Sequence, residues 1–224
     1  MISVIIPFYN EEKIFSANSD FFQGLSRKAE LIFVDGGSTD SGVDIAKNYS
    51  RVVQAKKGRA TQMNHGARLA QNDILLFLHA DNFIDIDVLA SIEDRLLNDD
   101  FIGGCLTQRI DKEGIIYRFI EEQGNRRARR KGVFYGDQGV FVKKDIFLKM
   151  GGYPDVPIME DVLFSKKLRE VGRVIVLDDK IIVSPRRWEK NGVAKTVALY
   201  NLIMILFYLK VPLHKIKRLY NDLR

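Results

Sequence analysis

Short apolar runs and amphipathic stretches alternate through the first half of the chain. The apolar runs are dense in Ile, Val, Leu and Phe, as in strands buried on both faces, and the stretches between them have helical spacing. The expected strands lie at 2–6, 31–34, 52–54 and 74–78, and the expected helices at 12–25, 41–49 and 61–70. This alternation predicts an α/β fold with a mainly parallel central sheet and helices on both faces.

The second half of the chain is less regular. The string "GGYPDVP" predicts a rigid, turn-rich loop. Strands are expected at 101–110, 139–142, 174–177 and 181–183, and helices at 117–130, 161–171 and 193–209, with a basic helix after Pro212. Because no internal repeat, low-complexity segment or linker interrupts the pattern, we expect a single domain.

Polar side chains follow each of the first four expected strands. The strings after them are "PFYNEE", "DGGSTDSG", "KKGRATQMN" and "HADN", and each brings carboxylates, amides, glycines or a guanidinium. In parallel α/β sheets, ligands bind beyond the carboxyl ends of the strands. One polar strand end is ordinary loop chemistry, but four in succession predict a binding cleft at that edge.

The fourth expected strand ends on His79 and Asp81. Residues two apart on an extended strand point the same way, so both side chains would face one ligand. Asp81 would then hold a divalent cation that bridges two phosphates, with most ligands supplied by water and the phosphates. In the alternative, Asp81 caps a helix that starts near Asp85, and His79 makes only local hydrogen bonds. The spacing favours neither.

The string "DGGSTDSG" also has two interpretations. Ser38, Thr39 or Asp40 is expected to cap the following helix, and the two glycines permit close approach of the backbone. Capping does not explain Asp35, which directly follows the strand. We expect Asp35 to recognise a base or a sugar.

The charge of the chain limits its classes of partner. A net charge of +6 over 224 residues suits a phosphate-bearing ligand, an anionic membrane surface or nucleic acid. The string "RRARRK" (126–131) predicts a solvated helix face or loop, a segment that closes over the phosphates, or a contact with anionic lipid. No aromatic residue interleaves with these charges, so nucleic acid is not the expected partner.

Cysteine content and the first residues bear on the compartment. The single Cys105 excludes an internal disulfide and a cysteine-cluster metal site, and it is expected in the core. The string "MISVIIPFYN" lacks the basic segment and the apolar length of a signal peptide. We therefore expect a cytoplasmic protein.

Several motifs together resemble those of a known family. They are "SVIIPFYNEE", "LIFVDGGSTDSG", a Gly-Arg helix start, the strand ending in "HAD", and "GGYPDVPIMEDVLFSKKL". In order and spacing, over about residues 3–188, they resemble family 2 glycosyltransferases of the GT-A fold. More narrowly, "GDQGVFVKK", "MEDV" and "RRWEKNG" resemble the bacterial group called selenodomain-associated transferase 2, a name that gives no substrate.

The resemblance implies a nucleotide site in the first half of the chain. Asp35 would accept a hydrogen bond from the base, typically uracil, and Arg59 would lie near the diphosphate or base. Asp81 matches the last Asp of the family's Asp-x-Asp motif, which holds Mn²⁺ or Mg²⁺ on the diphosphate. His79 stands in place of that motif's first Asp, which leaves open a ribose contact, a ligand favouring Mn²⁺, or weaker metal binding. The pocket would be lined by Pro7, Phe8, Tyr9, Asn10 and Glu11, with the ring of Phe8 or Tyr9 against the base.

Glu160 and Asp161 open an expected amphipathic helix, and capping of that helix would explain both. The resemblance instead implies that Asp161 is the general base, which takes the proton of an acceptor hydroxyl as it attacks the anomeric carbon. The neighbouring Glu160 carboxylate is expected to raise the pKa of the base and so improve it. One such displacement inverts the anomeric centre without a covalent intermediate.

Two further strings supply candidate contacts. Asp137 and Gln138 in "YGDQG" would touch the acceptor or the donor sugar; a turn at the start of a strand is the alternative. In "SPRRWEKNG", Arg187 would pair with the diphosphate and Trp188 would stack on an acceptor sugar. That string partly resembles the Gln-x-x-Arg-Trp motif of polysaccharide-forming members. Ser184 stands in place of Gln, which argues against processive polymerisation.

The apolar string at 196–209 is shorter than the roughly 20 residues that a bilayer-spanning helix needs. Lysines surround it. Contact with the inner face of a membrane is one expectation, and packing on the core or on a second subunit is the other.

The sequence therefore predicts one GT-A domain with a Rossmann-like nucleotide-binding half. The halves are expected at about 1–100 (nucleotide) and about 101–190 (acceptor and catalysis), with C-terminal helices at about 191–224. The expected activity is inverting transfer of a hexosyl group from a nucleoside-diphosphate donor, UDP favoured, to a small or lipid-linked hydroxyl. The alternatives are a non-catalytic nucleotide-sugar or lipid-binding protein, and a nucleotidyltransferase, which would need a glycine-rich phosphate loop that "PFYNEE" lacks.

Overall fold

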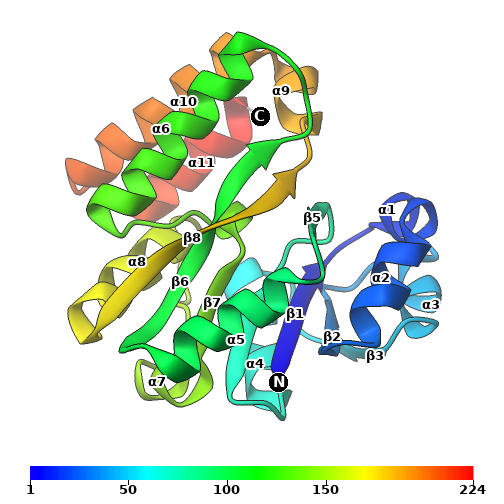
Figure 1. The fold of residues 1–224 in the computed structure, drawn as a ribbon. Helices are drawn as coiled ribbons and strands as arrows, with labels where there is room; N and C mark the ends of the chain where they lie inside the picture. The colour runs from blue at the N-terminus through cyan, green and yellow to red at the C-terminus, as the bar shows by residue number, and fades with distance from the viewer. Residues whose placement is uncertain (224) are drawn as a thin grey trace.

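A computed structural model describes residues 1–223 of the chain (Figure 1). Within this range the strands form one sheet of eight, in the order β3-β2-β1-β4-β7-β6-β8-β5. The strands are β1 (Ile2–Phe8), β2 (Glu30–Asp35), β3 (Arg51–Gln54), β4 (Ile74–Phe77), β5 (Asn82–Ile84), β6 (Phe101–Ile110), β7 (Val140–Lys143) and β8 (Arg173–Val183). The helices are α1 (Glu12–Ala17), α2 (Ser19–Ser26), α3 (Gly42–Lys47), α4 (Arg59–Leu69), α5 (Val88–Asn98), α6 (Ile115–Lys131), α7 (Lys144–Lys149), α8 (Glu160–Val171), α9 (Arg186–Asn191), α10 (Val193–Tyr208) and α11 (Leu213–Leu223), with a 3₁₀ turn η1 (Gly136–Gln138).

The sheet changes character at the pair of β4 with β7. β1 pairs in parallel with β2 and β4, and β2 pairs in parallel with β3, as the alternating pattern predicts. β4 then pairs antiparallel with β7, β7 antiparallel with β6, and β6 parallel with β8. The carboxyl ends of β1, β2 and β4 therefore lie together at one edge of the sheet.

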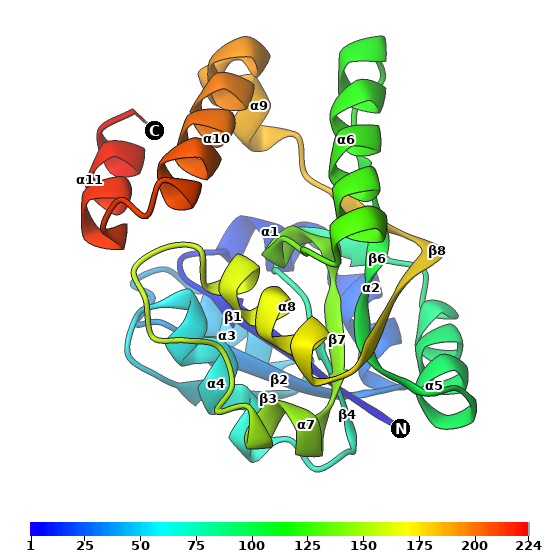
Figure 2. The same ribbon diagram turned by 90° about the vertical axis from the view of Figure 1, so that its left-hand side faces the viewer.

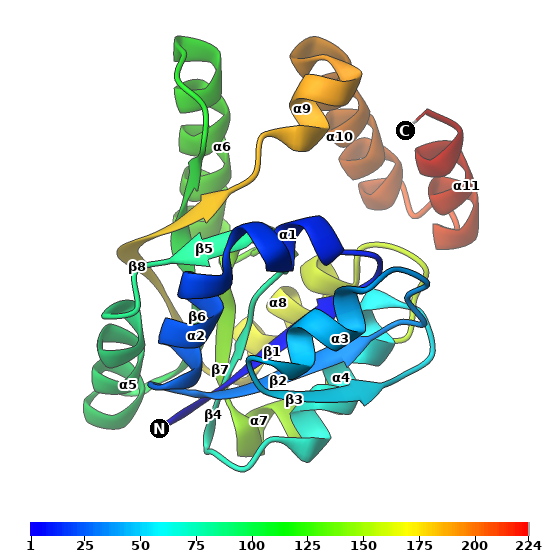
Figure 3. The same ribbon diagram turned by 90° about the vertical axis from the view of Figure 1, so that its right-hand side faces the viewer.

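Successive residues of β1 pack into two different cores. Ile2, Val4 and Ile6 lie in one core and Ile5 in the other, as the period of two along a strand requires. The first core contains side chains of α1, α2, α3 and α5, and the second contains side chains of α4, α7 and α8. Helices thus cover both faces of the sheet, as predicted (Figure 1 and Figure 3).

The helix expected at 12–25 is two helices, α1 and α2. Asn18 lies between them in a non-helical conformation, with φ −126° and ψ 36°. Its backbone N–H and its side-chain amide both donate to the carbonyl of Ile14. Local hydrogen bonding by asparagine competes with helix continuation, which explains the break.

A single strand, β8, replaces the two short strands expected at 174–177 and 181–183. β8 pairs with β6, and the register shifts between Leu106 and Thr107. The Thr107 hydroxyl donates to the carbonyl of Leu177 at 2.6 Å. Residues 178–179 therefore form a bulge inside a continuous strand. The elements that the pattern missed, β5, α7 and α9, each have six residues or fewer.

The C-terminal helices form a layer beside the start of α8. Figure 2 shows α10 and α11 side by side, with α6 standing away from the sheet. Leu199 and Ile203 of α10 and Ile216 of α11 share one apolar cluster with Val162 of α8. Over residues 1–223, no helix has the length and apolar character needed to cross a membrane.

Candidate active site

The candidate site lies at the edge of the sheet where β1, β2 and β4 end. The loops after these strands meet the turn η1 and the start of α8, which belong to the second half of the chain. The side-chain amide of Asn82 donates to the carbonyl of Asp137 at 3.1 Å. The N–H of Gly136 donates to Oδ2 of Asp161 at 2.7 Å. These two bonds bring the strand-end residues and the candidate base into one site.

Asp35 and Asn10 organise the loop after β2. Asp35 is 1% exposed at the end of β2, and its Oδ1 accepts the N–H of Ser38 at 2.9 Å. Asn10 lies in the left-handed region with φ 56°. Its N–H donates to Oγ of Ser38 at 2.9 Å, and its Oδ1 accepts the N–H of Thr39 at 2.8 Å. Asn10 therefore joins the loops after β1 and β2 and uses its side chain to do so.

Asp40 is the capping residue of the "DGGSTDSG" string. Its Oδ1 accepts the N–H of Gly42, the first residue of α3, at 3.0 Å. Its Oδ2 accepts the N–H of Glu12, the first residue of α1, at 3.0 Å. One carboxylate at the start of both helices satisfies donors that the helices leave free and complements their dipoles.

Of the residues at the end of β1, some lie in the core and others face the cleft. Pro7 stays within β1, opposite Val34 of β2. Phe8 is 3% exposed and packs edge-on against Phe15 at 5.1 Å between ring centroids, so the expectation that its ring contacts a base is corrected. Tyr9 is 39% exposed, with Nζ of Lys57 at 3.3 Å from its ring centroid. Of the two rings, Tyr9 is the one available to a ligand.

Gln62, on the buried face of α4, links three loops of the site and was missed by the sequence analysis. Its amide donates to the carbonyls of Phe8 and Val34 at 2.9 and 2.7 Å. Its carbonyl oxygen accepts the N–H of Gly58 at 3.3 Å. A Cβ on Gly36 would lie 3.1 Å from this amide, so the glycine is needed for the approach. A polar residue between Ala60 and Met63 was the available signal.

His79 and Asp81 lie in a turn beyond β4, and not on an extended strand as expected. The N–H of Asn82 closes this turn on the carbonyl of His79 at 3.1 Å. Oδ2 of Asp81 accepts Nη2 of Arg186 at 2.7 Å. Nη1 of the same guanidinium lies 3.5 Å from Oε2 of Glu11. No role for Arg186 was predicted from the sequence.

Electrostatics differ between the two carboxyls that face Arg186. Burial raises the pKa of Glu11, and Arg186 offsets this only in part. Burial also acts to raise the pKa of Asp81, but the hydrogen bond from Arg186 and the charge of His79 outweigh it and hold that pKa below its usual value. Asp81 therefore keeps its negative charge to a lower pH than Glu11 does.

Asp161 begins the first turn of α8 with both carboxylate oxygens bound by backbone N–H groups. Oδ2 accepts from Gly136 at 2.7 Å and Oδ1 accepts from Val162 at 2.8 Å. The residue ahead of the pair, Met159, has φ 70°, which is a strained conformation for a side chain other than glycine. The strain lies next to the two carboxylates that the sequence marks for chemistry.

Glu160 is buried and pairs with a residue expected at the nucleotide. Nη1 of Arg59 lies 3.6 Å from Oε1 of Glu160. Burial, and then the charge of Asp161, raises the pKa of Glu160. Arg59 lies between the two halves of the site.

Gly136 lets the turn after β4 approach Asp161. A Cβ on this residue would lie 3.1 Å from Nε2 of His79 and 3.6 Å from Oδ2 of Asp161. His79 therefore packs on the backbone that holds the candidate base.

The side chains of Asp137 and Gln138 both form hydrogen bonds within the protein. Oδ2 of Asp137 accepts the amide of Gln108 at 2.9 Å. Gln138 is completely buried, and its Oε1 accepts Nη2 of Arg127 at 2.8 Å and the N–H of Tyr135 at 3.1 Å. Gln138 is the last residue of the turn η1, and its buried side chain is held by one arginine of "RRARRK".

Comparisons with known proteins identify the family. Residues 3–149 match the model of glycosyl transferase family 2. The chain belongs to this family. An uncharacterized glycosyltransferase of Haemophilus influenzae is 35% identical over 40% of this chain and 39% of its own length. A probable glycosyltransferase of Bacillus subtilis, YdaM, is 22% identical over 76% of this chain and 47% of its own length. The chain thus spans less than half the length of either relative.

Solved structures share the fold. A mannosyltransferase of Pyrobaculum calidifontis, PcManGT, in complex with GDP-Man and Mn²⁺, superposes with a TM-score of 0.64 at 22% identity, over 81% of this chain and 56% of its own. TarS of S. aureus (1–349) in complex with UDP-GlcNAc gives 0.60 at 21% identity, over 82% of this chain and 58% of its own. The predicted GT-A type of fold is confirmed.

Family 2 membership raises the question of a divalent metal. Among the described residues, no group of three or more His, Cys, Asp or Glu side chains is arranged to hold one. Asp81 and Glu11 instead face one shared cation, the Arg186 guanidinium. Two carboxylates around one positive charge fit a metal that takes its remaining ligands from a diphosphate and water.

The residues of the string "SPRRWEKNG" lie only partly where the resemblance to family 2 implies. Trp188 is 6% exposed and packs with Ile110, Tyr117 and Val183, so its ring is not available to stack on a sugar. The Ser184 hydroxyl accepts the N–H of Arg186 at 3.3 Å at the start of α9. The side chain of Arg187 lies outside the described part of the chain.

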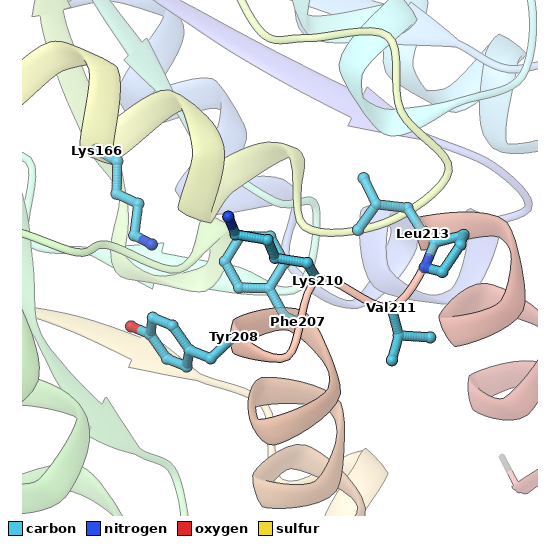
Figure 4. Close-up of a pocket in the computed structure, with 7 residues that line it drawn as sticks. Lys166, Phe207, Tyr208, Lys210, Val211 and Leu213 are labelled. Carbon is cyan, nitrogen blue, oxygen red and sulfur yellow. The ribbon is translucent and has the colours of Figure 1, made fainter.

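A hollow lies beside α8, on the side of the C-terminal helices (Figure 4). It has a volume of about 430 Å³, and Lys166 reaches it from α8, the helix that Asp161 helps to open. Nζ of Lys166 lies 4.7 Å from the ring centroid of Tyr208. The other lining residues are Phe207, Lys210, Val211, Pro212 and Leu213.

Proposed function

We propose that this protein is a glycosyltransferase that moves a hexosyl group from a nucleoside-diphosphate donor to a hydroxyl acceptor, with inversion. The observation that carries the proposal is the placement of Asp161 beside the turn that holds His79 and Asp81. Gly136 donates its N–H to Asp161, and a Cβ on Gly136 would lie 3.1 Å from Nε2 of His79 and 3.6 Å from Oδ2 of Asp161. A proton acceptor next to a diphosphate-binding carboxylate suits displacement at an anomeric carbon.

The first half of the chain would bind the donor. Tyr9 offers an exposed ring for the base. Asp35 is 1% exposed and its Oδ1 accepts the N–H of Ser38, so the base would reach this carboxylate only after the loop after β2 shifts. A carboxylate suits the N–H donors of uracil and also those of guanine, so UDP is favoured over GDP on the family resemblance and not on Asp35. Asp81 and Glu11 would lie at the diphosphate, where a bound Mn²⁺ or Mg²⁺ would neutralise charge on the leaving group.

Asp161 would act as the general base. As the acceptor oxygen forms its bond to the anomeric carbon, its proton passes to a carboxylate oxygen of Asp161. The bond between that carbon and the diphosphate oxygen breaks, and the electron pair leaves with the nucleoside diphosphate. The two backbone N–H groups on Asp161 fix its orientation before the acceptor arrives.

The hollow beside α8 favours a lipid-linked acceptor over a small one. Its lining combines the ring of Phe207 and aliphatic side chains with the ammonium groups of Lys166 and Lys210. This chemistry suits an apolar chain that carries a phosphate. The narrower resemblance to the selenodomain-associated group also stays a proposal and adds no substrate.

Calorimetric titration with UDP, GDP, CMP and ADP, each with Mn²⁺ and with a chelator, tests the donor site. We expect UDP to bind most tightly and the chelator to weaken it. Equal binding of all four nucleotides would contradict the role of Asp35. Nucleotide binding without any transfer to lipid-linked or small hydroxyl acceptors would favour the non-catalytic binding protein.

A further inference from the structure

Arg186 connects the last third of the chain to the nucleotide half. It is the first residue of α9, and its guanidinium reaches Oδ2 of Asp81 at 2.7 Å and Oε2 of Glu11 at 3.5 Å. Asp81 follows β4 and Glu11 follows β1, so the two carboxylates come from neighbouring strand ends. One cation from a distant segment thus bridges two loops of the donor site.

The two carboxylates need this cation. The charge of Asp81 acts on Glu11, which is already partly buried, and Arg186 lies against both carboxylates. Without Arg186 the loops would present two facing negative charges. A divalent metal held by Asp81 would meet the charge of the guanidinium that now lies against the same carboxylate, and two cations at one carboxylate repel each other.

We propose that Arg186 is a positioning residue that competes with the divalent metal for Asp81 and Glu11, so that the guanidinium holds the donor site while it is empty and leaves when the metal enters. The proposal rests on the proposed function, because it assumes that Asp81 holds the metal. It assigns Arg186 the role of a resident cation that keeps the two loops together between turnovers.

The rest of α9 is anchored independently of this ion pair. Trp188 packs with Ile110, Tyr117 and Val183, and Nζ of Lys112 lies 2.6 Å from Oε1 of Glu189. The Arg186 side chain is half-exposed. The guanidinium can therefore leave by rotation of its own side chain while α9 keeps its place, and substitution of Arg186 leaves the packing of α9 intact.

The test is Mn²⁺ binding by the full chain without nucleotide, followed by the paramagnetic resonance signal of free Mn²⁺. Arg186→Gln removes the competing charge, and Lys190→Gln, an exposed position on the same helix, removes an equal charge elsewhere. We expect R186Q to bind Mn²⁺ about twofold to fivefold more tightly than wild type, the size of a partly exposed ion pair. K190Q is expected to match wild type.

Equal or weaker Mn²⁺ binding by R186Q would overturn the competition, and so would an equal gain in K190Q. The proposed function is judged separately, by titration of the wild-type protein with UDP and Mn²⁺ together. If UDP binds with Mn²⁺ while R186Q shows no gain, the donor site stands and the role of Arg186 falls. If R186Q binds Mn²⁺ more tightly but neither protein binds a nucleotide, the competition stands and the donor site falls.

Discussion

The backbone N–H of Gly136 donates to Oδ2 of Asp161 at 2.7 Å, across 25 residues of sequence. This bond fixes a carboxylate at the start of α8 against the turn before β7. A fixed carboxylate loses less freedom when it takes a proton from an acceptor, which is the property expected of a general base.

Asp161→Asn tests that role. The amide keeps the shape of the side chain but cannot take the proton, so we expect transfer to fall by about 10²- to 10⁴-fold. Donor binding, measured by calorimetry, should remain. Asp155→Asn, an exposed change in the loop before α8, serves as the control. An Asp161→Asn enzyme with full activity would refute the assignment.

Gly136→Ala tests the close approach of His79 to the backbone that holds Asp161. The new methyl group would lie 3.1 Å from Nε2 of His79, so the imidazole or the turn must shift by a few tenths of an ångström. We expect kcat to fall about tenfold, with little change in the donor KM, because small displacements at the reacting groups are costly. A fall in thermal stability with unchanged kcat would show that the approach serves packing alone.

Gln62→Ala removes the link among the loops after β1, β2 and β3. The carbonyl of Val34 and the N–H of Gly58 lose this partner, and the carbonyl of Phe8 keeps the N–H of Gly36 at 3.0 Å. Each unsatisfied buried group costs about 1–3 kcal/mol. We expect the free energy of unfolding in urea to drop by about 2–4 kcal/mol. Gln71→Ala, at an exposed position after α4, should change it by less than about 0.5 kcal/mol.

Glu160 makes stability depend on pH. Burial and the charge of Asp161 raise the pKa of Glu160, so the folded protein keeps its proton to higher pH than the unfolded chain does. The corresponding stability is complete below the ordinary pKa of glutamate and is lost as pH rises through the raised pKa. We therefore expect the Tm of Glu160→Gln, relative to wild type, to increase from about pH 4 to about pH 8. Glu170→Gln, at an exposed position of α8, should show no such trend.

The alternation of side chains along β1 indicates which of the two rings, Phe8 or Tyr9, is buried. Ile2, Val4, Ile6 and Phe8 share one parity, and all four lie in the same core. Tyr9 follows the strand and is exposed. Counting the period of two along the strand would have placed the ring of Phe8 inside before the structure was known.

Other parts of the site depend on contacts that no local pattern reveals. Arg186 meets Asp81 across 105 residues, and Gln62 meets Phe8 across 54. Sequence spacing predicts which residues follow a strand, and this was enough to expect Asp35 and Asp81 at one edge, whereas Asp161 was expected there only from the family resemblance. It does not predict which distant cation or amide completes the site, because that depends on how the two halves of the sheet meet.

The pairing of β4 with β7 also affects the order in which the sheet can assemble while the chain is being synthesised. Ile74 has its partner at Lys143, and Leu76 has its partner at Phe141. A nascent chain that ends before β7 leaves this edge of β4 open, although β1, β2 and β3 can already assemble beside it. Glu160, Asp161 and Arg186 emerge from the ribosome later still. The strands whose ends form one side of the candidate site are therefore synthesised before the residues that complete it.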